Sequence, residues 1–135
     1  MARNLRRTLY VLSVVPIAAG LQSVLLGVDS VPSPGDPSAN LDSEFRFYSV
    51  WYIGAGLFLI WLAPRVERRT LELRVFCALL FLAGLSRVFA ALATDWPSRG
   101  QIILMVVELV LPIVFVLWQA AVVRRGAFAL PAREA

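Results

Sequence analysis

The sequence lacks histidine and lysine altogether and contains a single cysteine, Cys77. Without histidine there is no imidazole metal ligand and no Ser-His-Asp triad. Without lysine there is no Schiff base and no Walker phosphate loop. Cys77 has no partner for an internal disulfide, and its apolar neighbours disfavour the thiolate, so we expect it to serve in packing. These absences leave no catalytic residue, metal site or particular cofactor to predict, and they favour a protein that is not an enzyme.

Charged residues are also scarce, at 16% of 135 residues, whereas hydrophobic residues make up 59% and the mean hydropathy is +0.75. A soluble domain of this size could not bury so much apolar surface, so the surroundings must be largely lipid. Four apolar runs cover residues 8–28, 45–63, 73–93 and 101–123. Each approaches or exceeds the roughly 20 residues that a helix needs to cross a hydrocarbon core. The sequence therefore predicts an all-α, integral membrane four-helix bundle with antiparallel neighbours, forming a single domain over residues 1–135.

The first apolar run has an alternative interpretation as a cleaved signal peptide. Arg3, Arg6 and Arg7 would form its positively charged start. The apolar stretch is long for that role, and no clear cleavage motif follows it. We therefore expect the first run to remain as a membrane helix.

Arginine placement predicts the orientation of the chain. The thirteen basic residues are all arginine, and most flank the apolar runs rather than forming a basic face for nucleic acid. One side of the membrane would hold Arg3, Arg6, Arg7, Arg65, Arg68, Arg69, Arg74, Arg124, Arg125 and Arg133, and the other only Arg46 and Arg99. The positive-inside rule then places both termini in the cytoplasm and makes this a multi-pass protein of the cell membrane.

The connections between the runs differ in length. The outer loop, residues 29–44, contains a proline-rich segment at 31–37 that cannot be helical, and it leads to Asp42 or Ser43 as the expected N-cap of the second helix. The turn over residues 94–100 is short, so the third and fourth helices should be antiparallel neighbours. We expect the tail, residues 126–135, to be flexible.

Each apolar run contributes a polar side chain at a similar depth, roughly 9–10 Å below the outer end of its helix. These residues are Gln22, Tyr52, Arg87 and Glu108. Ionisable groups inside a membrane face a partner or a wet cavity, so we expect Arg87 to pair with Glu108. Pro112 also removes the hydrogen bond normally donated to the Glu108 carbonyl, which makes this spot rich in acceptors.

Helical periodicity indicates which faces adjoin this layer. In the fourth run one stripe comprises Gln101, Met105, Glu108, Pro112, Phe115 and Gln119. Small residues should permit close helix packing in the first two runs, namely Ala19, Ser23 and Gly27, then Gly54 and Gly56.

Two interpretations of the layer remain open. In one, the ion pair only fixes how helices pack, as in a structural subunit of a membrane complex. In the other, it forms a pocket open to the outer face that holds a lipid head group, a quinone head or another small amphiphile. The candidate ligand-binding residues are then Arg87, Glu108, Gln22 and Tyr52, with Tyr48 on the wall and Asp42, Glu44 and Arg46 at the mouth. A membrane enzyme or transporter is the third possibility. Expected partners are the bilayer, a lipid or amphiphile, and another membrane protein or a second copy, but no nucleic acid.

Several of these residues also carry a family resemblance. The segment Asn40-Leu41-Asp42-Ser43-Glu44-Phe45-Arg46-Phe47-Tyr48, followed by Trp51, Tyr52 and Gly54, resembles the second-helix signature of small bacterial four-helix membrane proteins. Arg87 and Glu108 also match their pattern. This family is catalogued as a domain of unknown function and is distantly DoxX-like in appearance. The chain's own composition, with arginine as its only basic residue and much alanine and valine, is similar to an actinobacterial style. The resemblance covers residues 8–123 and implies the four-helix fold, with Asp42, Glu44, Arg46, Arg87 and Glu108 as one set. It implies no reaction.

Overall fold

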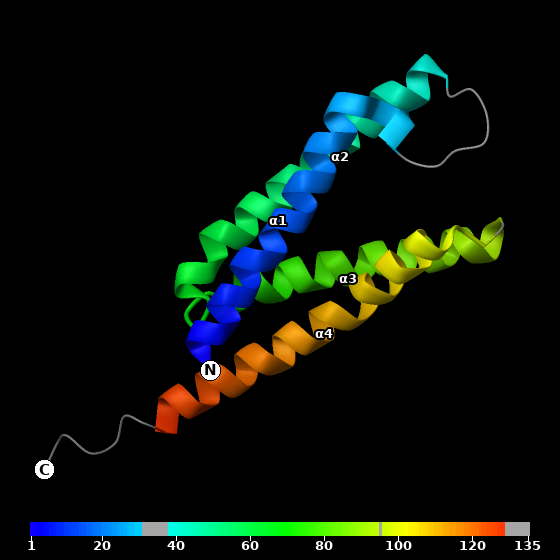
Figure 1. The fold of residues 1–135 in the computed structure, drawn as a ribbon. Helices are drawn as coiled ribbons and strands as arrows, with labels where there is room; N and C mark the ends of the chain where they lie inside the picture. The colour runs from blue at the N-terminus through cyan, green and yellow to red at the C-terminus, as the bar shows by residue number, and fades with distance from the viewer. Residues whose placement is uncertain (31–37, 95, 129–135) are drawn as a thin grey trace, which may run out of the picture. The chain divides into compact units, whose positions relative to one another are not determined.

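The computed structural model describes residues 1–30, 38–94 and 96–128, and in these ranges it contains helices and no strand (Figure 1). The elements are α1 (Ala2–Leu26), η1 (Gly27–Ser30), α2 (Ala39–Leu62), η2 (Ala63–Arg65), α3 (Thr70–Ala93) and α4 (Arg99–Phe128). All four α-helices are long and apolar enough to cross a membrane. The expected all-α fold with four membrane-length helices is therefore confirmed.

Each helix begins before its apolar run, because hydropathy marks the part suited to lipid, whereas caps and hydrogen bonds decide where a helix begins and ends. α2 begins at Ala39 rather than at residue 45, and its N-cap is Ser38, whose Oγ accepts a hydrogen bond from the Leu41 N–H at 3.2 Å. The prediction of Asp42 or Ser43 as the cap is therefore wrong. α4 continues to Phe128. The expected flexible tail lies outside the described residues from position 129 onward, as does the proline-rich segment at 31–37.

The chain divides into two compact units, and we describe each by itself. The first unit, Arg3–Pro64, contains α1 and α2, which approach each other closely at two glycines. A Cβ added to Gly20 would lie 2.8 Å from the Ser49 carbonyl oxygen, and one added to Gly56 would lie 2.6 Å from the Ser13 carbonyl oxygen. Small residues thus let the two backbones meet, as they do in membrane helix pairs.

The small residues at this seam agree with the prediction at Gly56 and differ from it elsewhere. Gly20, not Ala19, faces α2, since Ala19 is exposed. In α2, Gly56 is buried in the seam, whereas Gly54 is exposed and has nothing within 4 Å of an added Cβ. The predictions for Ala19 and Gly54 were wrong because apolar composition alone does not reveal which side of a uniformly apolar helix meets its neighbour.

The second unit contains α3 and α4, which lie side by side and are joined at one end by the turn after Thr94 (Figure 1). The expected antiparallel arrangement of these two helices is confirmed. The predicted stripe of α4 is its buried face, comprising Met105, Glu108, Pro112, Phe115 and Gln119. Gln119 is almost fully buried, and its Nε2 donates to the Val66 carbonyl at 2.6 Å and to Thr70 Oγ1 at 3.2 Å. α4 is thereby bonded to the segment that precedes α3.

Candidate functional site

Arg87 joins α3 to two residues of α4. Its Nε donates to Glu108 Oε2 at 2.7 Å, and its Nη1 donates to Gln101 Oε1 at 2.6 Å. Gln101 and Glu108 are seven residues apart, which is about two helical turns, so both side chains project from one face of α4. The expected pairing of Arg87 with Glu108 is therefore confirmed.

The ion pair between Arg87 and Glu108 lies where α3 and α4 pack closely. Gly84 lies three residues before Arg87 on α3, and a Cβ added there would be 2.9 Å from Leu109 Cγ and 3.2 Å from the Glu108 carbonyl carbon. The missing side chain lets the α4 backbone approach α3 next to the ion pair. Pro112 lies within α4 and has no N–H to donate to the Glu108 carbonyl. Glu108 therefore presents both a carboxylate and a backbone oxygen without its usual helical donor.

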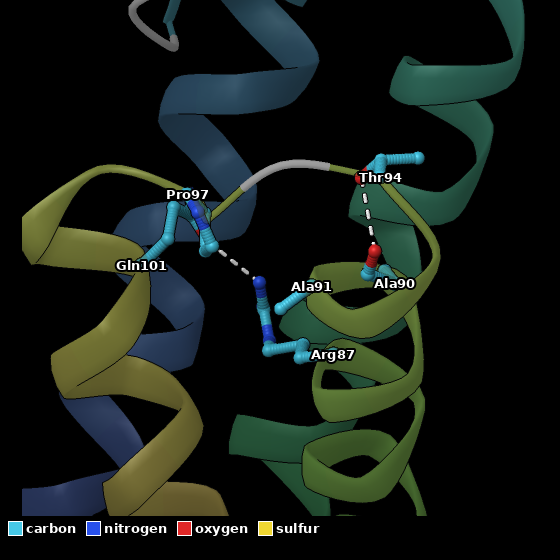
Figure 2. A pocket seen from close by; sticks show the side chains of 6 residues that line it. All are labelled: Arg87, Ala90, Ala91, Thr94, Pro97 and Gln101. Carbon is cyan, nitrogen blue, oxygen red and sulfur yellow. Dashed lines mark hydrogen bonds between the residues drawn. The ribbon is translucent and has the colours of Figure 1, made fainter.

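A cavity of about 200 Å³ opens beside Arg87, between the last turns of α3 and the first turns of α4 (Figure 2). Its lining comprises Arg87, Ala90, Ala91, Thr94, Pro97 and Gln101. The Thr94 hydroxyl donates to the carbonyl of Ala90 at 2.9 Å, so it is engaged by its own helix. The walls are therefore mostly apolar, and Arg87 and Gln101 supply the polar groups.

The two members of the ion pair differ in exposure. The Glu108 side chain is 11% exposed, whereas that of Arg87 is 28% exposed and lines the cavity. The carboxylate thus serves as a nearly enclosed anchor, and the guanidinium is the part of the pair that a molecule in the cavity can reach. Such an arrangement can hold a hydrogen-bond acceptor. Within the described ranges no group of three or more His, Cys, Asp or Glu side chains is arranged to hold a metal ion.

The structure also brings together two other predicted site residues, Asp42 and Arg46, in the unit formed by α1 and α2. Arg46 Nε donates to Asp42 Oδ2 at 2.7 Å, and Arg46 Nη1 donates to the carbonyl of Val24 at 2.6 Å. Asp42 Oδ1 in turn accepts from the Val28 N–H at 3.0 Å. The pair therefore binds the backbone where α1 ends. Gly27 lies in this bend with φ of 63°, a conformation that glycine adopts readily.

Four other predicted site residues, Gln22, Glu44, Tyr48 and Tyr52, are exposed. The ring of Tyr48 contacts that of Phe47 edge to face, with centroids 5.3 Å apart. Binding roles for these four residues, for Asp42 and for Arg46 stay predictions, as does the single layer expected from Gln22, Tyr52, Arg87 and Glu108.

Gln101 is a residue of the candidate site that the sequence analysis assigns to the predicted stripe of α4 but not to the site itself. Gln101 belongs to the predicted stripe of α4, yet only the structure shows it bonded to Arg87. Its seven-residue spacing from Glu108 was the available signal. Gln119 was similarly placed on the stripe, but its bond to the Val66 carbonyl connects residues 53 positions apart and has no local signature.

Four membrane-length helices and an arginine–glutamate pair between two of them define a multi-pass membrane protein with an ionisable pair among apolar helices. The chain belongs to the family described as a domain of unknown function (DUF4345), whose model matches residues 5–119. Comparison with curated proteins and with solved structures found no match in either. The resemblance to a family of unknown function is thus confirmed, whereas bacterial origin and likeness to DoxX stay predictions.

Proposed function

We propose that this membrane protein binds the polar head of a lipid or small amphiphile in the cavity beside Arg87. The observation that carries the proposal is the position of the guanidinium. Arg87 is anchored by Glu108, yet more than a quarter of its side chain is exposed, and it lines a cavity with otherwise mostly apolar walls. Apolar walls with a few placed polar groups are typical of sites for small ligands.

The main alternative is a structural subunit in which the pair only fixes the packing of α3 against α4. In its favour, Arg87 has acceptors on α4 at both Glu108 and Gln101, so the pair already joins the two helices. A device for packing alone, however, needs no arginine side chain exposed in an open depression next to the ion pair. The cavity of about 200 Å³ therefore favours binding.

The proposal includes an orientation in the cell membrane. Arginine placement supports a cytoplasmic location for both termini, which would put the turn between α3 and α4 outside. Arg87 is six residues before the end of α3 at Ala93, so it would lie roughly 9 Å below the outer end of that helix. At this depth a head group could meet the guanidinium while its chain stays in the outer leaflet.

Native mass spectrometry of the purified protein tests the binding function. We expect wild type to retain a small amphiphile and Arg87→Met to lose most of it. Arg74→Met is the matched control, because Arg74 is an exposed arginine of the same helix that does not line the cavity. Circular dichroism would verify that both variants remain helical. Equal retention by Arg87→Met and Arg74→Met, or no retained molecule in wild type, would leave the structural alternative.

A further inference from the structure

We infer that the molecule bound beside Arg87 presents a neutral carbonyl oxygen, such as that of an ester or ketone, which replaces Gln101 Oε1 as the acceptor for Arg87 Nη1. The inference rests on the proposed function. In it, the Gln101 side chain occupies the hydrogen-bonding position on Arg87 until the ligand displaces it. The group that now accepts from Nη1 is itself a neutral carbonyl oxygen, 2.6 Å away. The site therefore already contains the kind of hydrogen bond, from arginine to a neutral carbonyl oxygen, that the ligand would form.

Exposure separates the exchangeable acceptor from the permanent one. Gln101 is half-buried and lines the cavity, and it lies near the start of α4, which begins at Arg99. Glu108 is nearly enclosed and does not line the cavity. A ligand that enters the cavity therefore meets the bond between Arg87 and Gln101 first (Figure 2). Arg87 Nε would keep its hydrogen bond to the Glu108 carboxylate when the ligand binds, so the Arg87 side chain need not change its rotamer.

Charge balance favours a neutral acceptor over an anion. Arg87 and Glu108 together carry no net charge, so a carboxylate that binds Arg87 would add a negative charge close to the Glu108 carboxylate. The helix dipole at the amino-terminal end of α4 attracts anions, but this effect typically strengthens the binding of an anion by only about fivefold or less. A carbonyl oxygen accepts the same hydrogen bond from arginine without adding charge.

Cavity size restricts the part of the ligand that enters. A volume of about 200 Å³ is below the roughly 300–1,000 Å³ of pockets that enclose whole drug-sized molecules. The cavity therefore suits a carbonyl and its immediate neighbours, with the hydrocarbon chain remaining in the bilayer.

A matched pair of probes tests the inference, namely methyl dodecanoate and dodecanoate, which share a chain and differ in charge at the carbonyl. Binding to the full-length protein in maltoside detergent is measured by calorimetry, at a pH where the acid is ionised. We expect the ester to bind wild type more tightly than the carboxylate does. Gln101→Ala removes the internal competitor, so the ester should bind about two- to tenfold more tightly, the equivalent of one hydrogen bond.

Further variants separate competition from a general effect on the cavity. Gln101→Glu places a charged acceptor against Arg87 and should weaken ester binding at least tenfold. Ser86→Ala is the control, because Ser86 is exposed on the same helix as Arg87, does not line the cavity and donates its hydroxyl to the Ala83 carbonyl, so affinity should be unchanged. With an isotope-labelled ester, the infrared carbonyl band should move to lower frequency in wild type but not in Arg87→Met. Gln101→Asn, whose amide is one methylene shorter, replaces Gln101→Ala if the latter does not fold.

The outcomes distinguish this inference from the proposed function. Tighter binding of dodecanoate than of the ester, or ester affinity that does not rise in Gln101→Ala, would overturn the neutral-carbonyl assignment. If Arg87→Met still loses a retained amphiphile in that case, the binding function stands and only the ligand class is wrong. If wild type retains no amphiphile and binds neither probe, the proposed function fails and the inference fails with it.

Discussion

Replacing Glu108 by methionine removes one charge of the α3–α4 pair while keeping a side chain of similar length. Arg87 would then lose the acceptor that lies 2.7 Å from its Nε and would keep Gln101. The guanidinium cannot escape the cost by losing its proton, because arginine stays protonated in proteins. The variant should therefore unfold more easily than wild type.

The magnitude follows from the exposure of the two side chains. Breaking a fully buried ion pair by removing one partner costs about 3–5 kcal/mol, and losing one charged hydrogen bond costs about 1.5–3 kcal/mol. Because Arg87 is 28% exposed and retains Gln101, the lower range applies. We expect Glu108→Met to lower the free energy of unfolding by about 2 kcal/mol. Glu108→Gln, which keeps an uncharged acceptor, should cost less.

A double-mutant cycle gives the decisive comparison. Arg87→Met alone leaves the more enclosed carboxylate without its cation and should cost at least as much as Glu108→Met. In the double variant both charges are gone, so the desolvation cost disappears and much of the loss should be recovered. Unfolding in mixed micelles, titrated with dodecyl sulfate and followed by circular dichroism, measures all four proteins. Additivity of the two single effects within about 0.5 kcal/mol would refute the reasoning, because residues that interact do not behave independently.

Two further predictions concern topology and helix packing. In a Cys77→Ala background, cysteine at exposed Ser98 should react with a membrane-impermeant thiol reagent in intact cells, whereas cysteine at exposed Pro64 should react only after permeabilisation; the reverse pattern would contradict the proposed orientation. Gly20→Ala should destabilise the α1–α2 pair by about 1–3 kcal/mol in the micelle assay, because its Cβ would lie 2.8 Å from the Ser49 carbonyl oxygen. Gly54→Ala, which meets nothing within 4 Å, is the control and should be neutral or slightly stabilising; equal effects would show that the seam is not tight.

The sequence predicts those features of the fold that the lipid environment imposes on a continuous stretch of residues. Lipid requires runs of roughly 20 apolar residues with internal hydrogen bonding, so composition and length were enough to predict four membrane-length helices. Helical periodicity also predicted the buried stripe of α4 from Met105 to Gln119. It failed at the start of α2, where Ser38 caps a polar first turn that hydropathy treats as loop.

For the candidate site, the sequence by itself determined that Arg87 and Glu108 need partners, because unpaired ionisable groups are costly among apolar helices. The two residues lie at similar depths on adjacent helices, so the sequence also predicted that they pair with each other. The tertiary structure decided how closely α3 and α4 approach at Gly84, whether Gln101 reaches the guanidinium, and where the cavity opens. These features depend on the rotation of each helix about its own axis. On helices apolar on every side, that rotation is set by packing between side chains far apart in the chain, which no local pattern records.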